Sequence, residues 1–159
     1  VLNGFERYGT EVTMACPALF IRKVTAPAWD NAFINHDAHR AYPAPNYLVM
    51  KLYRHHFAPT RVACDAPEAL NVAATKAEDG ALILKVVNPS ATEDVPARIA
   101  IEGIDAAHFR TWRVHSESID DKNTMENPNK IRIVESESDA DVTFPAHSVT
   151  VLRTQGSRP

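Results

Sequence analysis

Histidines are the side chains of this sequence that most readily suggest metal binding or proton transfer. His36 and His39 lie in one short segment, and His55 and His56 are adjacent. Side chains of adjacent helical residues diverge, so the second pair is poorly placed to chelate one ion. Their position at the end of a predicted helix is explained more simply by the helix dipole, which favours positive charge there. We therefore expect neither a metal site nor a cofactor.

The two cysteines, Cys16 and Cys64, do not lie at metal-ligand spacing from any partner. Each is surrounded by small or apolar residues, which predicts two buried free thiols. A disulfide between them stays open at this point, because sequence alone gives no distance between the two sulfurs.

Carboxylates are the other candidates for chemistry. Residues 135–141 (ESESDAD) predict a solvated acidic loop. A calcium site is the sharper alternative, but the spacing matches no EF-hand loop. Glu6 and Glu11 fall in the first predicted helix, where we expect them to be surface charges.

Composition excludes some partners. The 159 residues carry a formal net charge of -3, with 45% hydrophobic and 23% charged residues. This charge favours neither nucleic acid nor an anionic membrane as a partner. No apolar run approaches the roughly 20 residues of a membrane-spanning helix. The chain opens at Val1 without a signal-like segment, so we expect a fragment of a longer protein, and its compartment stays open.

The elements that position these residues differ between the two halves of the chain. In the first half, apolar residues from Phe5 to Leu19 fall near helical spacing, which predicts an amphipathic helix. Gly9 should weaken this helix by about 1 kcal/mol relative to alanine, and Pro17 should end it. Residues 32–34 form a short apolar run typical of a buried strand.

A second helix is predicted to begin near residue 46. Its buried face contains Leu48, Val49, Leu52, Tyr53 and His56. Pro59 marks where it must stop.

From about residue 60 the apolar pattern changes to that of short strands. We predict strands at residues 70–74, 82–87, 97–101, 110–114, 130–134 and 148–152. Alternation and clear turn signals, such as residues 78–80 (EDG), favour an antiparallel sandwich between about residues 62 and 154. Its inner faces are predicted to include Leu84, Val86, Ile99, Ile101, Val149 and Val151.

Several segments resemble one enzyme family in the family's own order. Residues 4–7 (GFER), 12–15 (VTMA) and 17–20 (PALF) resemble the helix after the seventh barrel strand of family 51 α-L-arabinofuranosidases. Residues 29–31 (WDN) with 34–37 (INHD) resemble the eighth strand and its loop, and residues 45–52 (PNYLVMKL) resemble the last barrel helix. Residues 84–88 (LKVVN), 123–128 (NTMENP) and 144–152 (FPAHSVTVL) are similar to the C-terminal domain.

The resemblance implies a mainly β chain, in which a jelly-roll-like antiparallel β-sandwich follows the last α/β elements of a TIM (β/α)8 barrel. The implied boundaries are 1–59 for the barrel elements and 60–159 for the sandwich. The family's reaction is retaining hydrolysis of terminal α-L-arabinofuranosyl groups by two glutamates about 5 Å apart. Both positions fall before Val1, so we assign no catalytic residue and expect the chain alone to be inactive.

Loops after barrel strands build the active-site face of such enzymes. The resemblance therefore implies that His36, Tyr42 and Asn46 bind the substrate, with Asp37 and His39 in the same loop. Tyr42 offers a stacking face and Asn46 offers paired donors and acceptors. The structural alternative is that these residues cap the last helix or hold the barrel to the sandwich.

Three functions compete. The first is the structural and accessory end of an arabinofuranosidase, whose partners are the rest of the parent barrel, an arabinofuranosyl-containing carbohydrate and other copies in a homo-oligomer. The second is a free-standing carbohydrate-binding sandwich, for which Trp112 is the candidate platform. The third is a bare structural domain for oligomer contacts. In the first case, the strand at residues 32–34 lacks barrel neighbours, so residues 1–58 are not expected to be stable independently.

Overall fold

The computed structural model describes residues 1–27, 32–103 and 108–155. The WDN segment at residues 29–31, which carried part of the resemblance, lies outside these ranges. The described residues form two helices and eleven strands. Most strands belong to the second half of the chain, as the change in apolar pattern predicts.

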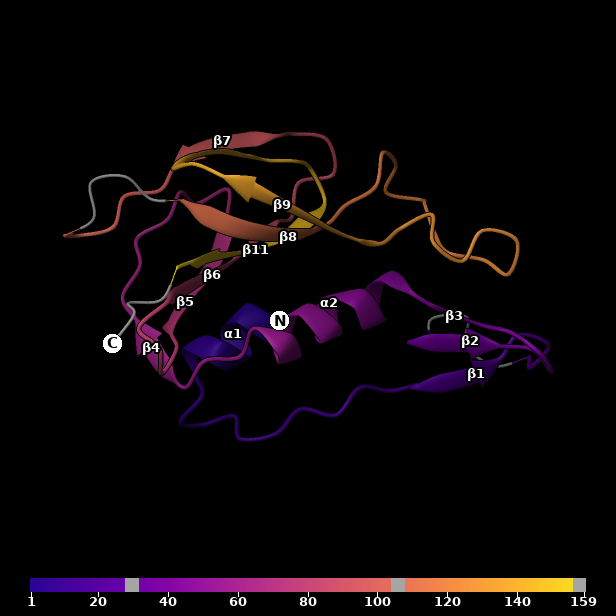
Figure 1. The fold of residues 1–159 in the computed structure, drawn as a ribbon. Helices are drawn as coiled ribbons and strands as arrows, with labels where there is room; N and C mark the ends of the chain where they lie inside the picture. Colours follow the sequence, from indigo (N-terminus) through magenta and orange to yellow (C-terminus); the bar gives the residue numbers. More distant parts are fainter. Residues whose placement is uncertain (28–31, 104–107, 156–159) are drawn as a thin grey trace.

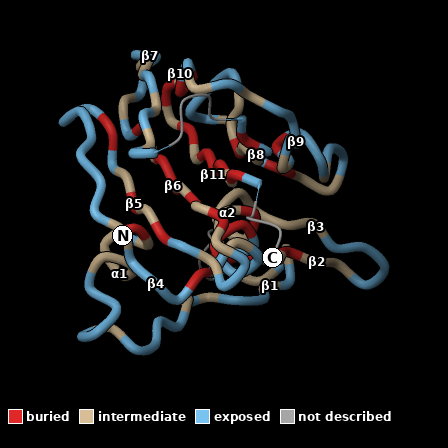
Figure 2. Tube along the Cα trace, turned by 60° about the vertical axis from the view of Figure 1, so that its left-hand side comes forward, coloured by how far each residue is buried: buried red, intermediate tan, exposed pale blue. Residues whose placement is uncertain are grey.

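The larger sheet is antiparallel and contains six strands. Their order across the sheet is β4 (Thr60–Val62), β5 (Asn71–Lys76), β6 (Leu82–Asn88), β11 (Ser148–Thr154), β8 (Phe109–Val114) and β9 (Ile133–Ser138). A second sheet pairs β10 (Asp141–Phe144) with β7 (Val95–Arg98), also antiparallel. The predicted antiparallel sandwich is confirmed. Its buried residues concentrate on the central strands (Figure 2).

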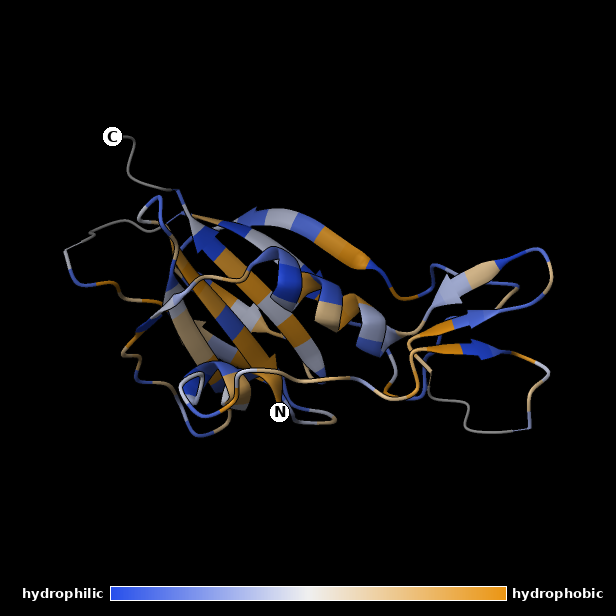
Figure 3. Ribbon diagram, turned by 90° about the horizontal axis from the view of Figure 1, so that it is seen from below, coloured by the Kyte–Doolittle hydropathy of each residue, from blue (hydrophilic) through white to orange (hydrophobic). Residues whose placement is uncertain are grey.

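Both faces of the larger sheet are covered (Figure 1). Val86 and Leu152 face the β7–β10 sheet, where Phe109 and Phe144 complete one core. Ile83 faces the helices. Strand side chains alternate between faces, so a sheet covered on both sides buries neighbouring residues of one strand. Figure 3 shows the resulting bands of hydropathy along the strands.

The predicted inner face was partly wrong. Leu84, Val86, Ile99 and Ile101 do share the core with the second sheet. Val151 is fully buried but belongs to the other core, against the helices. The prediction assumed one inner face for each strand, whereas β11 is covered on both sides.

Helix α2 (Pro45–His55) matches the second predicted helix. Proline suits its first turn, where the missing N–H would have no helical partner. Leu48, Leu52 and Tyr53 are buried, and the backbone N–H of His56 closes the last turn on Leu52. The helix packs on the larger sheet through the core that contains Ile83.

Helix α1 (Leu2–Arg7) is much shorter than predicted. It ends at Arg7, and turns follow from Tyr8 through Glu11, so the helical spacing from Val12 to Leu19 does not form a helix. Gly9 and three β-branched residues, Thr10, Val12 and Thr13, disfavour continuation.

A small sheet of β1 (Ile21–Lys23), β2 (Ile34–His36) and β3 (Ala41–Pro43) extends beyond one end of α2 (Figure 1). β1 and β2 are parallel, and β2 and β3 are antiparallel. The strand predicted at residues 32–34 thus begins two residues later. The prediction that it lacks a neighbour is wrong, because β1 and β3 pair with it on both sides.

One buried asparagine joins this small sheet to the sandwich. Asn123, which is 3% exposed, donates from Nδ2 to the carbonyl oxygens of Pro43 and Ile131, both at 2.9 Å. Its Oδ1 accepts the Ile131 N–H at 2.7 Å. The hydrogen bond to Pro43 ties the end of β3 to the long loop before β9, and the two with Ile131 hold that loop in shape.

Two further predictions were wrong. The acidic segment 135–141 is solvated, but it forms most of β9 and the start of β10 instead of a loop. Cross-strand partners explain this, since Arg110 pairs with Glu135 and Arg98 with Asp141. Cys16 and Cys64 are exposed free thiols, not buried ones, because each lies in a segment without regular structure.

Candidate functional site

A buried polar cluster joins α1 to the larger sheet. Lys85 on β6 is fully buried, and its Nζ forms an ion pair with Glu6 of α1. The ammonium also lies 4.9 Å from the centre of the Tyr53 ring. Tyr53 donates its hydroxyl to Asn3 Oδ1 at 2.5 Å, and Asn3 Nδ2 donates to the carbonyl oxygens of Asn71 and Lys85. The two helices are thus fixed to β5 and β6 by one network.

Burial governs the protonation of this cluster. Burial lowers the pKa of Lys85, and the hydrogen bond and charge of Glu6 oppose that shift. Burial, together with the charge of Glu6, raises the pKa of Tyr53 far above its ordinary value. The cluster is therefore a neutral assembly of one ion pair and a protonated phenol, which is the arrangement that a buried charge requires.

The sequence did not predict this cluster, and the expectation for Glu6 was wrong. Its side chain is only 15% exposed because α1 lies directly on the sheet. A signal was present in the lone lysine at position 85, which interrupts the apolar run of residues 82–87. A charge inside a buried strand needs a partner, but sequence does not say which residue supplies it.

An apolar groove lies beside the cluster, between α1, the end of α2 and β4–β5. It has a volume of about 910 Å³. Its apolar lining includes Leu2, Phe5, Val12, Met14, Met50 and Phe57. Met14 is 79% exposed and Phe57 is 61% exposed, which is unusual for side chains of this size. We call this feature the helix groove.

One wall of the helix groove is a chain segment without backbone partners. Val12, Thr13, Met14 and Ala15 line the groove. In the described part of the chain, no backbone–backbone hydrogen bond involves residues 13–18. The next two residues, Leu19 and Phe20, accept the N–H groups of Phe33 and Ile34. Polar backbone and apolar side chains are therefore both open to a partner along this wall.

The three predicted sugar-binding residues lie in and after the small sheet. His36 is on β2, Tyr42 is on β3 and Asn46 is in the first turn of α2, and all are half-buried. Tyr42 pairs with Asn35 in the register, and His36 pairs with Ala41. His36 and Tyr42 consequently point to opposite faces of this sheet.

The remaining residues of that loop close a turn. Asp37 Oδ1 accepts the backbone N–H groups of His39 and Arg40, both at 2.7 Å. These hydrogen bonds lower the pKa of Asp37 below its ordinary value. Asp37 thus shapes the β2–β3 turn, and His39 contributes its backbone to it.

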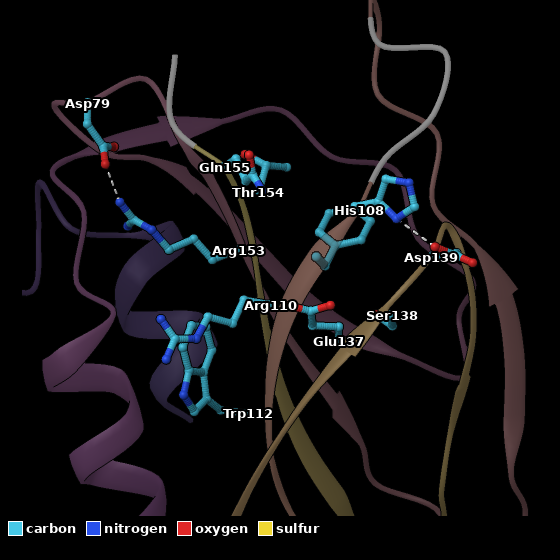
Figure 4. Close-up of a pocket in the computed structure, with 11 residues that line it drawn as sticks. Asp79, His108, Arg110, Trp112, Glu137, Ser138, Asp139, Arg153, Thr154 and Gln155 are labelled. Carbon is cyan, nitrogen blue, oxygen red and sulfur yellow. Dashed lines mark hydrogen bonds and ion pairs between the residues drawn. The ribbon is translucent and has the colours of Figure 1, made fainter. Parts of the chain in front are cut away.

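A second, polar pocket of about 780 Å³ lies at the far end of β8 and β11 (Figure 4). Within it, Asp79 contacts Arg153 and His108 contacts Asp139. Trp112, the candidate sugar platform, lines this pocket.

Two side chains of the chain itself already pack against the Trp112 ring. The His56 ring packs against it with centroids 4.1 Å apart, and the Arg110 guanidinium lies 5.2 Å from its centre. A sugar platform needs an open aromatic face. This arrangement therefore disfavours the rival hypothesis of a binding module built on Trp112.

Across residues 1–27, 32–103 and 108–155, no group of three or more His, Cys, Asp or Glu side chains could hold a metal ion. Neither helix in these ranges is both long and apolar enough to cross a membrane.

The fold and the helix groove define a β-sandwich domain that carries helices on its outer face. Residues 1–148 match the family described as "Alpha-L-arabinofuranosidase C-terminal domain". The chain belongs to this family. The match confirms the resemblance to the C-terminal portion of a family 51 α-L-arabinofuranosidase that the sequence indicates.

Solved structures share the fold. The arabinose-bound α-L-arabinofuranosidase MgGH51 gives a TM-score of 0.83 at 19% identity, covering 98% of this chain and 26% of that chain. The arabinofuranosidase of Xanthomonas axonopodis pv. citri gives 0.76 at 22% identity, covering 96% and 33%. The family 51 enzyme of Bifidobacterium longum gives 0.74 at 17% identity, covering 98% and 33%.

The chain therefore spans between about a quarter and a third of the length of these structures. A comparison with curated protein sequences finds no match.

Proposed function

We propose that this chain is the accessory C-terminal part of a retaining α-L-arabinofuranosidase, and that the two catalytic glutamates belong to the rest of the parent. The helix groove carries the proposal, because its exposed apolar side chains and unpaired backbone suit a larger partner within the same protein. The family match and the partial coverage of the related structures support it.

An activity assay tests this proposal. The full-length parent should release the phenol from an aryl α-L-arabinofuranoside, and the isolated 159-residue chain should not, because it lacks both the acid and the nucleophile. An aryl α-arabinopyranoside is a matched control for ring form. Turnover by the isolated chain at a rate near that of the parent would contradict the proposal.

We also propose that residues 1–59 belong to the barrel of the parent and residues 60–159 to the sandwich, and that the junction between them is not a hinge. Leu48, Leu52 and Ala58 precede it, yet they share one core with Ile83 and Val151. Rigid packing of this kind would hold the last barrel helix on the sandwich. The sandwich then acts as a fixed support for the barrel.

We propose that an arabinofuranosyl group of the substrate contacts His36, Tyr42 and Asn46. Their positions in and after the small sheet support a shared neighbourhood, although His36 and Tyr42 use opposite faces of that sheet. In the parent, Tyr42→Phe and Asn46→Ala should raise KM for the aryl arabinofuranoside. His39→Ala is the control, since its backbone makes the turn contact. An unchanged KM in both variants would show that Tyr42 and Asn46 do not bind the substrate.

A further inference from the structure

A long loop of the sandwich reaches the small sheet. Residues 115–132 connect β8 to β9, and Figure 1 shows this loop, in orange, extending on the same side of the molecule as β1–β3. Asn123 donates to the Pro43 carbonyl oxygen at the end of β3. The Arg40 guanidinium donates to the Met125 carbonyl oxygen at 3.5 Å, which is a long hydrogen bond. The loop therefore lies against the segment from which the proposed substrate contacts come.

The order of these contacts gives the loop a direction. Pro43 pairs with Ile34, the first residue of β2, whereas Arg40 lies in the turn beyond the last residue of β2. From Asn123 to Met125 the loop therefore runs toward the carboxyl end of β2. Substrates of (β/α)8 enzymes bind at the carboxyl ends of the barrel strands. The residues that follow Met125 thus lie at the end where a substrate would bind.

The tip of the loop is a closed turn. The Thr124 N–H donates to the carbonyl oxygen of Asn127 at 3.2 Å, and the Asn127 N–H donates to the Thr124 hydroxyl at 3.1 Å. Nearer the base of the loop, Lys130 forms an ion pair with Asp121 at 2.5 Å. A turn held in this way loses little conformational freedom when it binds a ligand.

The side chains of this turn select the chemistry of the ligand. Glu126 and Asn127 are exposed, and Met125 beside them is half-buried. The Glu126 backbone N–H, the Thr124 hydroxyl and the charge of Arg40 hold the pKa of Glu126 below its ordinary value, so its carboxylate is ionised at neutral pH. A carboxylate accepts hydrogen bonds, an amide both donates and accepts them, and a thioether packs on C–H groups. This combination suits a sugar, which offers hydroxyl groups and C–H faces together.

We propose that the turn at residues 124–127 binds the sugar unit next to the terminal arabinofuranosyl group of an oligomeric or polymeric substrate. Glu126 accepts hydrogen bonds from hydroxyl groups of that sugar, and Asn127 exchanges hydrogen bonds with it. This inference rests on the proposed function, and it gives the sandwich a part in substrate selection. Because the buried Asn123 ties the loop to β3, the sandwich and the small sheet present one binding surface.

Kinetics of the full-length parent test the contact. Glu126→Gln and Asn127→Ala should each lower kcat/KM for an oligomeric or polymeric substrate about three- to tenfold, mainly through KM, because each weakens or removes a hydrogen bond to a sugar hydroxyl. Turnover of an aryl α-L-arabinofuranoside should stay unchanged, because an unsubstituted aryl group offers no hydroxyl. Glu78→Gln is the matched control, since it makes the same change at an exposed glutamate in the β5–β6 turn and should alter neither rate.

Linear arabinofuranotriose and soluble arabinoxylan are both measured, because they place different sugars next to the terminal group. A loss of kcat/KM for either one, with the aryl substrate unaffected, supports the proposal. Equal losses for sugar and aryl substrates, no loss for either sugar substrate, or a wild-type parent that hydrolyses only the aryl substrate would overturn it. A wild-type parent that hydrolyses none of the three contradicts the proposed function itself, and this inference with it.

Discussion

The imidazole ring of His56 packs against the indole ring of Trp112, with centroids 4.1 Å apart and planes inclined by 41°. His56 caps the end of α2, and Trp112 lies on β8 of the larger sheet. The contact therefore fastens the helix to the sandwich. Burial, followed by the positive charges of Lys85 and Arg153, lowers the pKa of His56 from 6.5 to about 4.

This lowered pKa predicts that acid weakens the fold. Between pH 6.5 and about 4, unfolded His56 binds a proton that the folded residue does not. The free energy of unfolding should therefore be fully retained above pH 6.5 and fall as the pH drops through this window. Because the ring is half-exposed, we expect a loss of about 1–2 kcal/mol from this residue. Urea unfolding at several pH values measures it.

The adjacent histidine gives the control for this experiment. His56→Gln should flatten the pH dependence between 6.5 and 4, whereas His55→Gln should leave it unchanged, because His55 is exposed. Equal pH profiles for the wild type and His56→Gln would contradict the assignment.

Lys85→Met should destabilise the chain by about 3–5 kcal/mol, because it leaves the buried Glu6 carboxylate without its counter-charge. Denaturant unfolding measures the loss. Lys130→Met is the control, since the Lys130 side chain in its ion pair with Asp121 is 46% exposed whereas that of Lys85 is fully buried, and the change should cost less than about 1 kcal/mol.

The double variant Lys85→Met with Glu6→Leu should recover much of that stability, because it removes both charges from the apolar environment. If Lys85→Met alone proves as mild as Lys130→Met, the buried pair does not anchor α1.

Asn123→Ala should destabilise the chain by about 2–3 kcal/mol and loosen the small sheet, because it removes the hydrogen bond to Pro43 of β3 and the two that hold the loop at Ile131. Amide hydrogen exchange should rise at residues 34–43. Asn127 lies in the same loop with an exposed side chain, so Asn127→Ala is the control. Unaltered exchange at residues 34–43 in Asn123→Ala would show that other contacts hold this sheet.

Both cysteines should react with a maleimide in the folded chain, because both are exposed. Burial, which is partial, and the charge of Asp65 raise the pKa of the Cys64 thiol, so Cys64 should react more slowly than Cys16 near pH 7. Mass spectrometry of the labelled peptides gives both rates. Protection of both thiols under native conditions would restore the original prediction that they are buried.

The sequence by itself determined the local elements with strong patterns. Pro45 and the spacing of Leu48 and Leu52 specified α2, and alternation specified the central strands β6 and β11. Residues 78–80 predicted a turn, and Gly80 there adopts a φ of 81°, which glycine tolerates best. The family resemblance rested on short motifs in their order along the chain, and those motifs needed no tertiary information.

Only the tertiary structure decided which groups meet. Glu6 and Lys85 are 79 residues apart, and their pairing depends on how α1 lies on β6. The strand character of residues 135–138 depends on β8 as a neighbour, since glutamate and serine alone do not favour a strand. The same holds for the helix groove, because its walls come from segments that no local pattern brings together. These contacts depend on packing between residues far apart in the chain, and the periodicity of the sequence does not predict them.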